Sequence, residues 1–206
     1  MCGRYVITKA IYKTKKIVKA VINVDDNENY NAHPYQNLPV VKKYNNGNTI
    51  EGLRWGIVTS WMKKKDYKPL INARLETIEE KITFKKLIKT YRCIAVADGY
   101  YEWKRFENGK IPYFFYRQDK KPLFFAGVYD KNEFCLITRE ASKNVLEIHH
   151  RQPVIINQKD INDYLNLELN GHNFLSSYQS PELSFYQISK EVNKPLNNNI
   201  SLIQKI

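Results

Sequence analysis

The chain has 206 residues, enough for one domain with a sizeable core, and its 43% hydrophobic content excludes a disordered protein. No run of residues approaches the roughly 18 apolar residues of a membrane span, and residues 1–20 lack the apolar core of a signal peptide. The formal net charge of +12 favours a polyanionic partner, although a lysine-rich proteome would give the same excess. We therefore expect a soluble, cytoplasmic protein, nucleoid-associated if it is bacterial.

The first expected elements are a helix over Lys9–Ile22, whose apolar residues form a helical stripe, and two short strands that flank the turn Asn45–Asn48. A second helix is expected over Thr77–Thr90, where Thr77 and Glu80 have the spacing of a capping box. The rest of the chain consists mainly of strand-like runs.

These runs share apolar, β-branched and aromatic residues, and they are Cys93–Ala97, Tyr100–Arg105, Tyr113–Tyr116, Leu123–Tyr129, Phe134–Thr138 and Val154–Ile156. A short helix over Lys159–Leu167 and a late strand over Glu182–Ser189 complete the pattern. Together the elements predict an α+β fold in a single domain that spans residues 1–206. Its centre would be a β-barrel-like, mostly antiparallel sheet with flanking helices.

The cysteines separate into two kinds. Cys93 and Cys135 lie in apolar runs and are interpreted as core thiols, and no CxxC spacing indicates a zinc site or a disulfide framework. Cys2 differs because removal of Met1 would make it the first residue. Its α-amine, with an ordinary pKa of about 7.7–8.0, and its thiol would then both reach one aldehyde and close a five-membered thiazolidine. Position alone favours an incidental cysteine.

Three further stretches carry residues suited to chemistry. Asn72 and Arg74, in PLINARLET, could hold a phosphate or a reacting oxygen, although a polar strand edge explains them equally well. Glu102, in ADGYYEWKR, would be a carboxylate in an aromatic setting, where burial raises the pKa and suits a general acid/base. The alternative for Glu102 is an exposed side chain paired with Lys104.

The histidines His149 and His150 precede a short apolar strand in EIHHRQPVII. Adjacent residues of an extended segment face opposite ways, so we expect only one of the two to enter a site, as a general acid/base or an anion stabiliser. The remaining histidines, His33 and His172, have no ligand spacing. We therefore expect neither a metal ion nor a cofactor.

These stretches, in this order, resemble the SOS-response-associated peptidase (SRAP) family, the abasic-site processing proteins. The resemblance covers essentially the whole chain, through MCGRY at the start, YNAHP (30–34), LRWGIVTSW (53–61), INARLET (71–77), CIAVADGYYEWKR (93–105), PYFFY (112–116), FFAGVYD (124–130), IHHRQPVII (148–156) and ISKEVN (188–193). It implies a single α+β domain around a barrel-like core. It also implies a basic groove that binds single-stranded DNA containing an abasic site, including sites at junctions with duplex.

The resemblance further implies a reaction in DNA repair and the SOS response. Cys2 matches the nucleophile that traps the abasic aldehyde as a covalent thiazolidine, once the protein has removed its own Met1 by a peptidase-type activity. Asn72 matches the residue that positions the cysteine and the opened sugar. Glu102 matches the acid/base, and His149 matches the residue for sugar-ring opening and stabilisation of the intermediate. A lyase activity is a further possibility within the same chemistry.

For DNA contact, the resemblance assigns Arg4, Arg74 and Arg151 to phosphates and Trp61 to an aromatic wedge that bends the strand near the lesion. We expect a monomer. Two alternatives stay open: a thiol peptidase that acts on other proteins through Cys2, and a non-catalytic module that binds single-stranded DNA.

Overall fold

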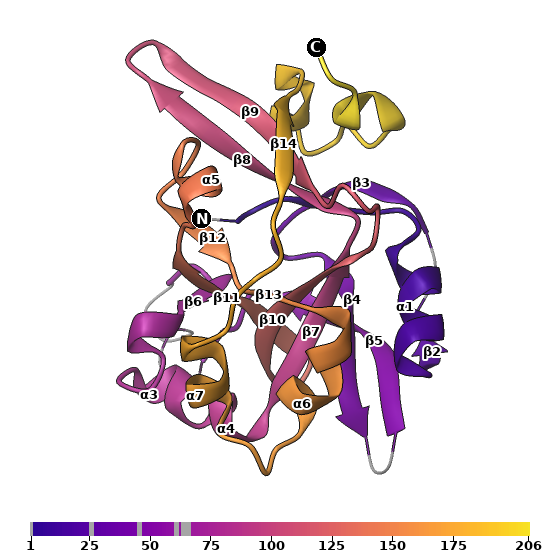
Figure 1. Ribbon diagram of the computed structural model, residues 1–206, viewed down its shortest axis with the longest axis vertical. Coiled ribbons are helices and arrows are strands. Elements are labelled where there is room, and N and C mark those ends of the chain that lie inside the picture. Colours follow the sequence, from indigo (N-terminus) through magenta and orange to yellow (C-terminus); the bar gives the residue numbers. More distant parts are fainter. Residues whose placement is uncertain (1, 25–26, 45–46, 60–61, 63–66) are drawn as a thin grey trace.

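The computed structural model describes residues 2–24, 27–44, 47–59, 62 and 67–206, and within them the strands form two sheets (Figure 1). The five-stranded sheet has the order β14-β9-β8-β1-β3, from β1 (Tyr5–Ile7), β3 (Asn29–Ala32), β8 (Gly99–Phe106), β9 (Gly109–Tyr116) and β14 (Ser184–Gln187). The nine-stranded sheet has the path β12-β11-β10-β7-β4-β5-β2, with β13 beside β10 and β6 beside β11. Its strands are β2 (Val21–Asn23), β4 (Asn37–Tyr44), β5 (Gly47–Trp55), β6 (Asn72–Arg74), β7 (Arg92–Ala97), β10 (Leu123–Asp130), β11 (Glu133–Glu140), β12 (Arg151–Pro153) and β13 (Ile155–Ile156).

The larger sheet curls back on itself. Most of its pairs are antiparallel, but β5 also meets β11 in parallel, with Arg54 opposite Glu133 and Trp55 opposite Phe134. This seam is short, so the sheet is barrel-like rather than a completed barrel. The predicted α+β class and the mostly antiparallel sheet are thereby confirmed.

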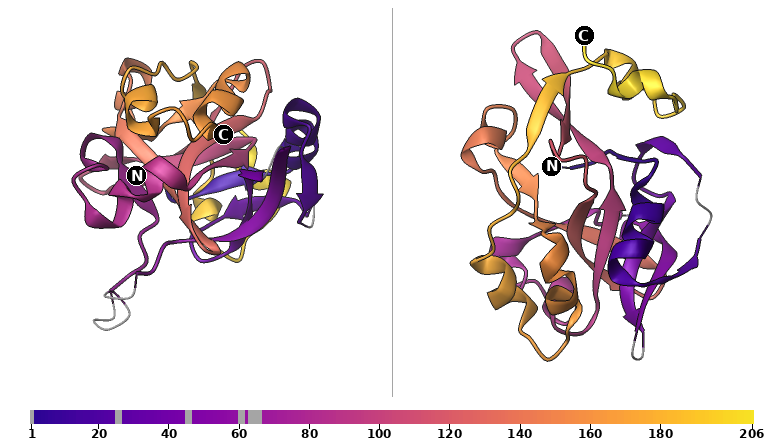
Figure 2. Two further views of the ribbon diagram at one scale, coloured as in Figure 1. Left: turned by 90° about the horizontal axis from the view of Figure 1, so that it is seen from below. Right: turned by 45° about the vertical axis from the view of Figure 1, so that its right-hand side comes forward.

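Helices lie outside the sheets (Figures 1 and 2). They are α1 (Ala10–Val18), α3 (Ile82–Lys85), α4 (Leu87–Thr90), α5 (Lys143–Leu146), α6 (Ile161–Leu165) and α7 (Gly171–Ser176), with 3₁₀ turns η1 (Leu75–Thr77), η2 (Gln158–Asp160), η3 (Lys190–Asn193) and η4 (Ile200–Ile203). Both α1 and α6 pack against β7. Across the described ranges, no helix has the length and apolar character that crossing a membrane would require.

Aromatic side chains join the two sheets. Tyr5 on β1 and Tyr100 on β8 are cross-strand partners, and both are fully buried. Their rings meet Phe125 on β10 at centroid distances of 5.7 Å and 5.9 Å, and Tyr5 also lies 5.0 Å from Trp55 on β5. Large aromatic rings bury much apolar area. This contact therefore holds β1, and with it the residues that precede it, against the larger sheet.

The predicted strands are confirmed, whereas two predicted helices need correction. The helix expected over Lys9–Ile22 ends at Val18, because Lys19 adopts a left-handed conformation (φ 51°) and the chain then enters β2 beside β5. The single helix expected over Thr77–Thr90 is wrong. Lys81 is extended (ψ 117°), and the chain forms two short helices, α3 and α4, that bury apolar side chains of both. Tertiary packing overrides the helical pattern there.

Several boundaries also shift. The helix expected over Lys159–Leu167 is η2 followed by α6, and the late strand is confined to Ser184–Gln187. The strands that flank the predicted turn Asn45–Asn48 are β4 and β5, with Tyr44 opposite Gly47. The two central residues of that turn lie outside the described residues.

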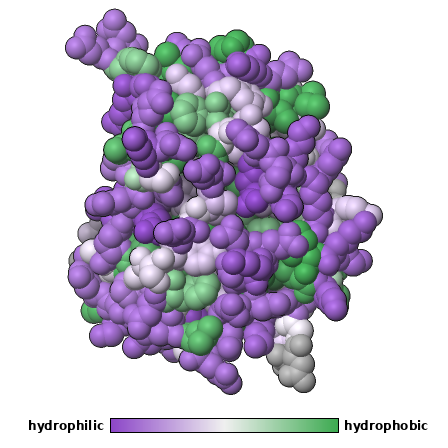
Figure 3. Space-filling view, in the orientation of Figure 1, coloured by the Kyte–Doolittle hydropathy of each residue, from purple (hydrophilic) through white to green (hydrophobic). Residues whose placement is uncertain are grey.

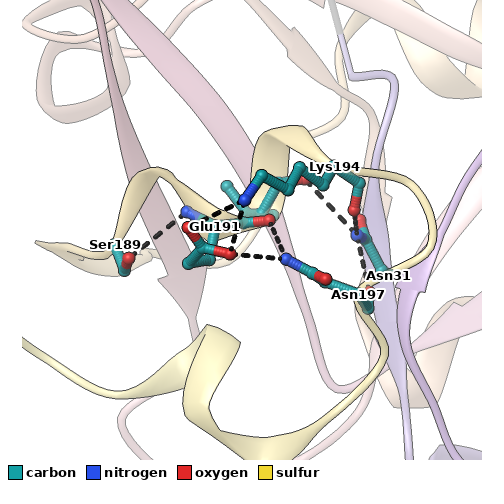
Figure 4. Close-up of polar contacts among 6 residues, drawn as sticks. Asn31, Ser189, Glu191, Lys194 and Asn197 are labelled. Atoms are coloured by element: carbon teal, nitrogen blue, oxygen red, sulfur yellow. Dashed lines mark hydrogen bonds and ion pairs between the residues drawn. The ribbon is translucent and has the colours of Figure 1, made fainter.

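Buried Asn31, on β3, fastens the C-terminal segment to the domain (Figure 4). Its Nδ2 donates to the carbonyls of Val192 (3.4 Å), Lys194 (3.0 Å) and Asn197 (2.9 Å). The Glu191 carboxylate accepts from Asn197 Nδ2 (2.8 Å) and closes the loop on its outer side. Since each buried carbonyl needs a donor, one side chain determines the path of residues 192–197.

Candidate active site

Cys2 is buried at the entrance to β1, and an amide holds its backbone. Asn72, the first residue of β6, donates from Nδ2 to the Cys2 carbonyl at 3.0 Å. The Cys2 Sγ lies 4.0 Å from the carbonyl oxygen of Arg4. Burial raises the pKa of the Cys2 thiol far above its ordinary value, and the negative charge of Glu102 adds to the effect. The thiol is therefore protonated at neutral pH.

Glu102 lies on β8, where it is 3% exposed. Burial raises the pKa of its carboxyl above the ordinary value. The alternative of an exposed glutamate paired with Lys104 is wrong, because Lys104 Nζ lies 3.6 Å from Glu147 Oε1 instead. The strand places a carboxyl that retains its proton more strongly than usual beside the buried Cys2.

His149 lies between α5 and β12 and faces Glu102, with 4.0 Å between His149 Nε2 and Glu102 Oε1. Its Nδ1 accepts a hydrogen bond from the backbone N–H of Arg151 at 3.0 Å. Nδ1 also lies 3.3 Å from the Arg151 carbonyl oxygen, but the shorter contact with the backbone N–H assigns the proton of the neutral ring to Nε2. Burial, together with smaller effects of nearby positive charge, lowers the pKa of His149 to about 4. His149 is therefore a neutral hydrogen-bond donor at physiological pH.

The two adjacent histidines do not face opposite ways, contrary to the sequence expectation. The rings of His149 and His150 stack, with centroids 4.4 Å apart and an interplanar angle of 23°. The chain bends at this point rather than running as an extended strand. The alternation of side chains that the prediction assumed is therefore absent.

Arg151 fixes the backbone behind His149. Its Nη1 and Nη2 each bind one oxygen of Glu76 at 2.9 Å, and Nη2 also lies 3.3 Å from Thr138 Oγ1. The Glu76 carboxylate accepts, in addition, the backbone N–H of Glu140 at 3.0 Å. A bidentate arginine–carboxylate pair has a defined geometry, so Glu76 joins η1, next to Asn72, to β12, next to His149.

A role for Glu76 was not predicted from the sequence, although Glu76 lies in the same alternation as Asn72 and Arg74. Its partner Arg151 is 75 positions away in the chain. The alternation Asn72, Arg74, Glu76 was the available signal. It indicated polar residues but did not indicate which partner each would have.

The residues expected to contact DNA differ in their exposure and in their hydrogen-bond partners. Arg4 Nη1 donates to Asn31 Oδ1 (2.8 Å) and to the carbonyl of Val192 (2.7 Å), which ties β1 to β3 and η3. Arg74 is exposed at the end of β6, and nothing in the described part of the chain forms an ion pair with it. Trp61 lies outside the described residues.

The structure thus brings Cys2, Asn72, Glu102 and His149 into one region between β1, β6, β8 and β12, with Arg151 directly behind His149. In the described ranges, no cluster of three or more His, Cys, Asp and Glu side chains is arranged to hold a metal ion. The chemistry available is that of a thiol, a carboxyl and a neutral imidazole. These groups can add to an electrophile and move protons.

The family model of the SOS response associated peptidase (SRAP) matches residues 1–195. The chain belongs to this family. It is 32% identical to the abasic site processing protein YoqW of Bacillus subtilis, with 99% of each chain covered, and 33% identical to YoaM of the same organism, with 98% of this chain and 97% of YoaM covered. A crystal structure of a protein from Bacteroides thetaiotaomicron has a TM-score of 0.83 over the full length of both chains, at 23% identity, and confirms the SRAP fold.

Proposed function

We propose that this SRAP protein processes abasic sites in single-stranded DNA by linking Cys2 covalently to the opened sugar as a thiazolidine. The observation that carries the proposal is the placement of buried Cys2, held by Asn72, beside the facing pair Glu102 and His149. The relatives named above are abasic site processing proteins, which supports the substrate class. The charge of +12 supports a nucleic-acid partner.

The first step is ring opening, since an abasic sugar is mostly a closed hemiacetal. The Glu102 carboxylate takes the proton of the C1′ hydroxyl, the bond from C1′ to the ring oxygen breaks, and the carboxyl returns that proton to the ring oxygen. His149 Nε2–H donates a hydrogen bond to the ring oxygen as negative charge develops there. The raised pKa of Glu102 suits it to carry the proton, and the low pKa of His149 keeps its ring a neutral donor.

The covalent steps need the free α-amine of Cys2, so the proposal includes removal of Met1, consistent with the peptidase in the family name. The amine attacks the C1′ aldehyde, and its two protons pass one after the other through Glu102 to the former aldehyde oxygen, which leaves as water and gives the imine. The Cys2 sulfur then bonds to the imine carbon, and the thiol proton passes to the imine nitrogen. Aldehyde, amine and thiol give one thiazolidine and one water. Asn72 holds the Cys2 carbonyl and so fixes the amine and thiol relative to the sugar.

The test is incubation of the Met1-processed protein with a single-stranded oligonucleotide that carries one abasic site, followed by a denaturing gel and intact mass. We expect a heat-stable adduct, formed without borohydride, whose mass is protein plus oligonucleotide minus one water. The Cys2→Ala variant should bind the oligonucleotide and form no adduct. An unprocessed sample, with Met1 retained, should also fail. Absence of an adduct with Met1 confirmed to be removed would contradict the proposal.

A further inference from the structure

The hairpin formed by β8 and β9 extends away from the body of the protein (Figures 1 and 2). Its strands pair continuously from Tyr100 opposite Phe115 to Phe106 opposite Gly109. The root is anchored, since Trp103 Nε1 donates to Asn193 Oδ1 at 2.8 Å. Beyond Trp103 the last two pairs of residues at the tip are exposed. In Figure 3 hydrophilic residues lie at the outer end of this projection, with hydrophobic ones beside them.

The tip carries an unbalanced positive charge. Arg105 lies directly opposite Lys110, and neither forms an ion pair with an acidic side chain within the described residues. Like charges at directly opposite positions of an antiparallel pair are destabilising. An anion bound between Arg105 and Lys110 would relieve this repulsion, whereas the neighbouring Lys104 already has a partner in Glu147.

An exposed aromatic ring lies at the same end of the hairpin, on the face of Lys104 and opposite to that of Arg105 and Lys110. Phe106 is 50% exposed, and its cross-strand partner is Gly109, which has no side chain to cover the ring. Lys104 Nζ lies 5.9 Å from the ring centroid. Cations together with an exposed aromatic face are the combination with which proteins bind single-stranded nucleic acid, through phosphates and stacked bases.

The tip is close to the candidate active site along the same strand. Arg105 follows Glu102 by three residues, which is about 10 Å at the rise of a β-strand. The ion pair of Lys104 with Glu147 ties the hairpin to the segment that leads into His149. A strand that enters the site would therefore pass the tip within a few nucleotides of the reacting sugar.

We propose that the tip of the β8–β9 hairpin is a second nucleic-acid contact, which binds the strand flanking the lesion. Arg105 and Lys110 contact its phosphates, and Phe106 stacks on a base. The identity of that strand rests on the proposed function. The contact itself needs no covalent chemistry.

The test compares two double variants that remove equal charge. Arg105→Ala with Lys110→Ala removes the tip cations, and Lys85→Ala with Lys89→Ala removes two exposed cations from α3 and α4, at the other end of the molecule (Figure 1). Binding is measured against salt with an oligonucleotide carrying a tetrahydrofuran abasic analogue, which has no aldehyde. We expect the tip variant to lower the slope of log K against log salt by about 1.4, for two single-strand phosphate contacts, and the control to change it much less.

Equal slopes for the two double variants would overturn the proposal. Phe106→Ala should weaken binding without altering the slope, and unchanged affinity would remove the stacking contact.

If the alanine variant of the tip fails to fold, Arg105→Gln with Lys110→Gln keeps the side-chain length and tests the same prediction. Cross-linking to an abasic nucleotide with only its immediate neighbours should be equal in wild type and Lys110→Ala, which leaves in place the charge of Arg105 that acts on Glu102 and His149. If wild type forms no cross-link, the proposed function fails, and the salt slopes still decide the role of the hairpin.

Discussion

His149 and Glu102 titrate in the reverse of their ordinary order. Their facing atoms lie 4.0 Å apart, burial raises the pKa of Glu102 above its ordinary value, and burial lowers the pKa of His149 to about 4. On acidification the carboxyl therefore takes a proton before the imidazole does. The order keeps His149 neutral at physiological pH and suits the proposed role of Glu102 as proton carrier.

The depressed pKa of His149 predicts a dependence of stability on pH. The unfolded histidine, with a pKa near 6.5, binds a proton between about pH 4 and 6.5, whereas the folded one does not. The unfolded state then holds more protons, so stability rises with pH across this window and is lost on acidification. Between pH 7 and pH 5 we expect the free energy of unfolding to fall by about 1–2 kcal/mol less in His149→Gln than in wild type, since a pKa shift of one unit corresponds to about 1.4 kcal/mol.

Urea unfolding of both proteins at the two pH values measures this difference. Glu102 has the opposite sign, because a raised carboxyl pKa lowers stability as pH rises above the ordinary value. The comparison of wild type with His149→Gln isolates the histidine, since Glu102 is present in both. Equal losses in the two proteins would show that His149 is not held neutral by the fold.

Glu102→Gln should slow cross-link formation far more than it weakens DNA binding. The amide preserves the shape of the buried side chain but cannot carry a proton, and loss of a general acid/base costs about 10²–10⁴-fold in rate. Single-turnover cross-linking gives the rate, and the tetrahydrofuran oligonucleotide gives the affinity. Parallel losses in both measurements would make Glu102 a binding residue instead.

Glu76→Gln should disturb the support of His149 through Arg151. The variant leaves a 7% exposed guanidinium without its opposite charge. Since Glu76 itself is 41% exposed at its side chain, we expect about 1–3 kcal/mol of destabilisation, below the full cost of breaking a buried pair. A double-mutant cycle with Arg151→Met measures the coupling. Additive losses would show that the pair contributes nothing to the fold.

Arg74→Ala should weaken binding without slowing cross-linking at saturating DNA. Arg74 is exposed at the end of β6, two residues from Asn72. Loss of one phosphate contact lowers the salt slope by about 0.7 for a single strand. The slope for wild type and variant provides the measurement, and identical slopes would exclude Arg74 from the DNA contact.

Asn31→Ala should release the C-terminal segment. The two amide N–H groups of the side chain are shared among three carbonyls and its oxygen accepts from Arg4, and unpaired buried polar groups cost about 1–3 kcal/mol each. We expect at least about 2 kcal/mol of destabilisation and faster hydrogen exchange at residues 188–203. Asn144→Ala, an exposed asparagine on α5, is the matched control and should change neither quantity. Unchanged exchange in Asn31→Ala would contradict the role assigned to Asn31.

The sequence predicted the strands better than the helices for a physical reason. Runs such as Cys93–Ala97 and Leu123–Tyr129 are buried along their length in the curled sheet, so their apolar composition reflects their environment directly. The pattern over Thr77–Thr90 also reflects burial, of Phe84, Leu87 and Ile88, but two short helices satisfy it as well as one long helix.

Local motifs indicated which residues belong to the candidate site, but not how these residues contact one another. Cys2, Asn72, Glu102 and His149 each stood in a recognisable stretch. The groups that fix their protonation and orientation are distant in the sequence or belong to the backbone. The Arg151 N–H sets the tautomer of His149, and Glu76, which is far from Arg151 in the sequence, holds the Arg151 side chain. Pair contacts of this kind depend on the register of β6 beside β11, which no single stretch encodes.

The burial of Cys2 affects how long its thiol stays chemically unmodified in the cell. Peroxides and soluble alkylating agents attack the thiolate, and a fully buried thiol with a strongly raised pKa presents almost none. Under the proposed function, each molecule would react once and be consumed. A protonated, buried sulfur would then keep unreacted molecules competent until they meet an abasic aldehyde.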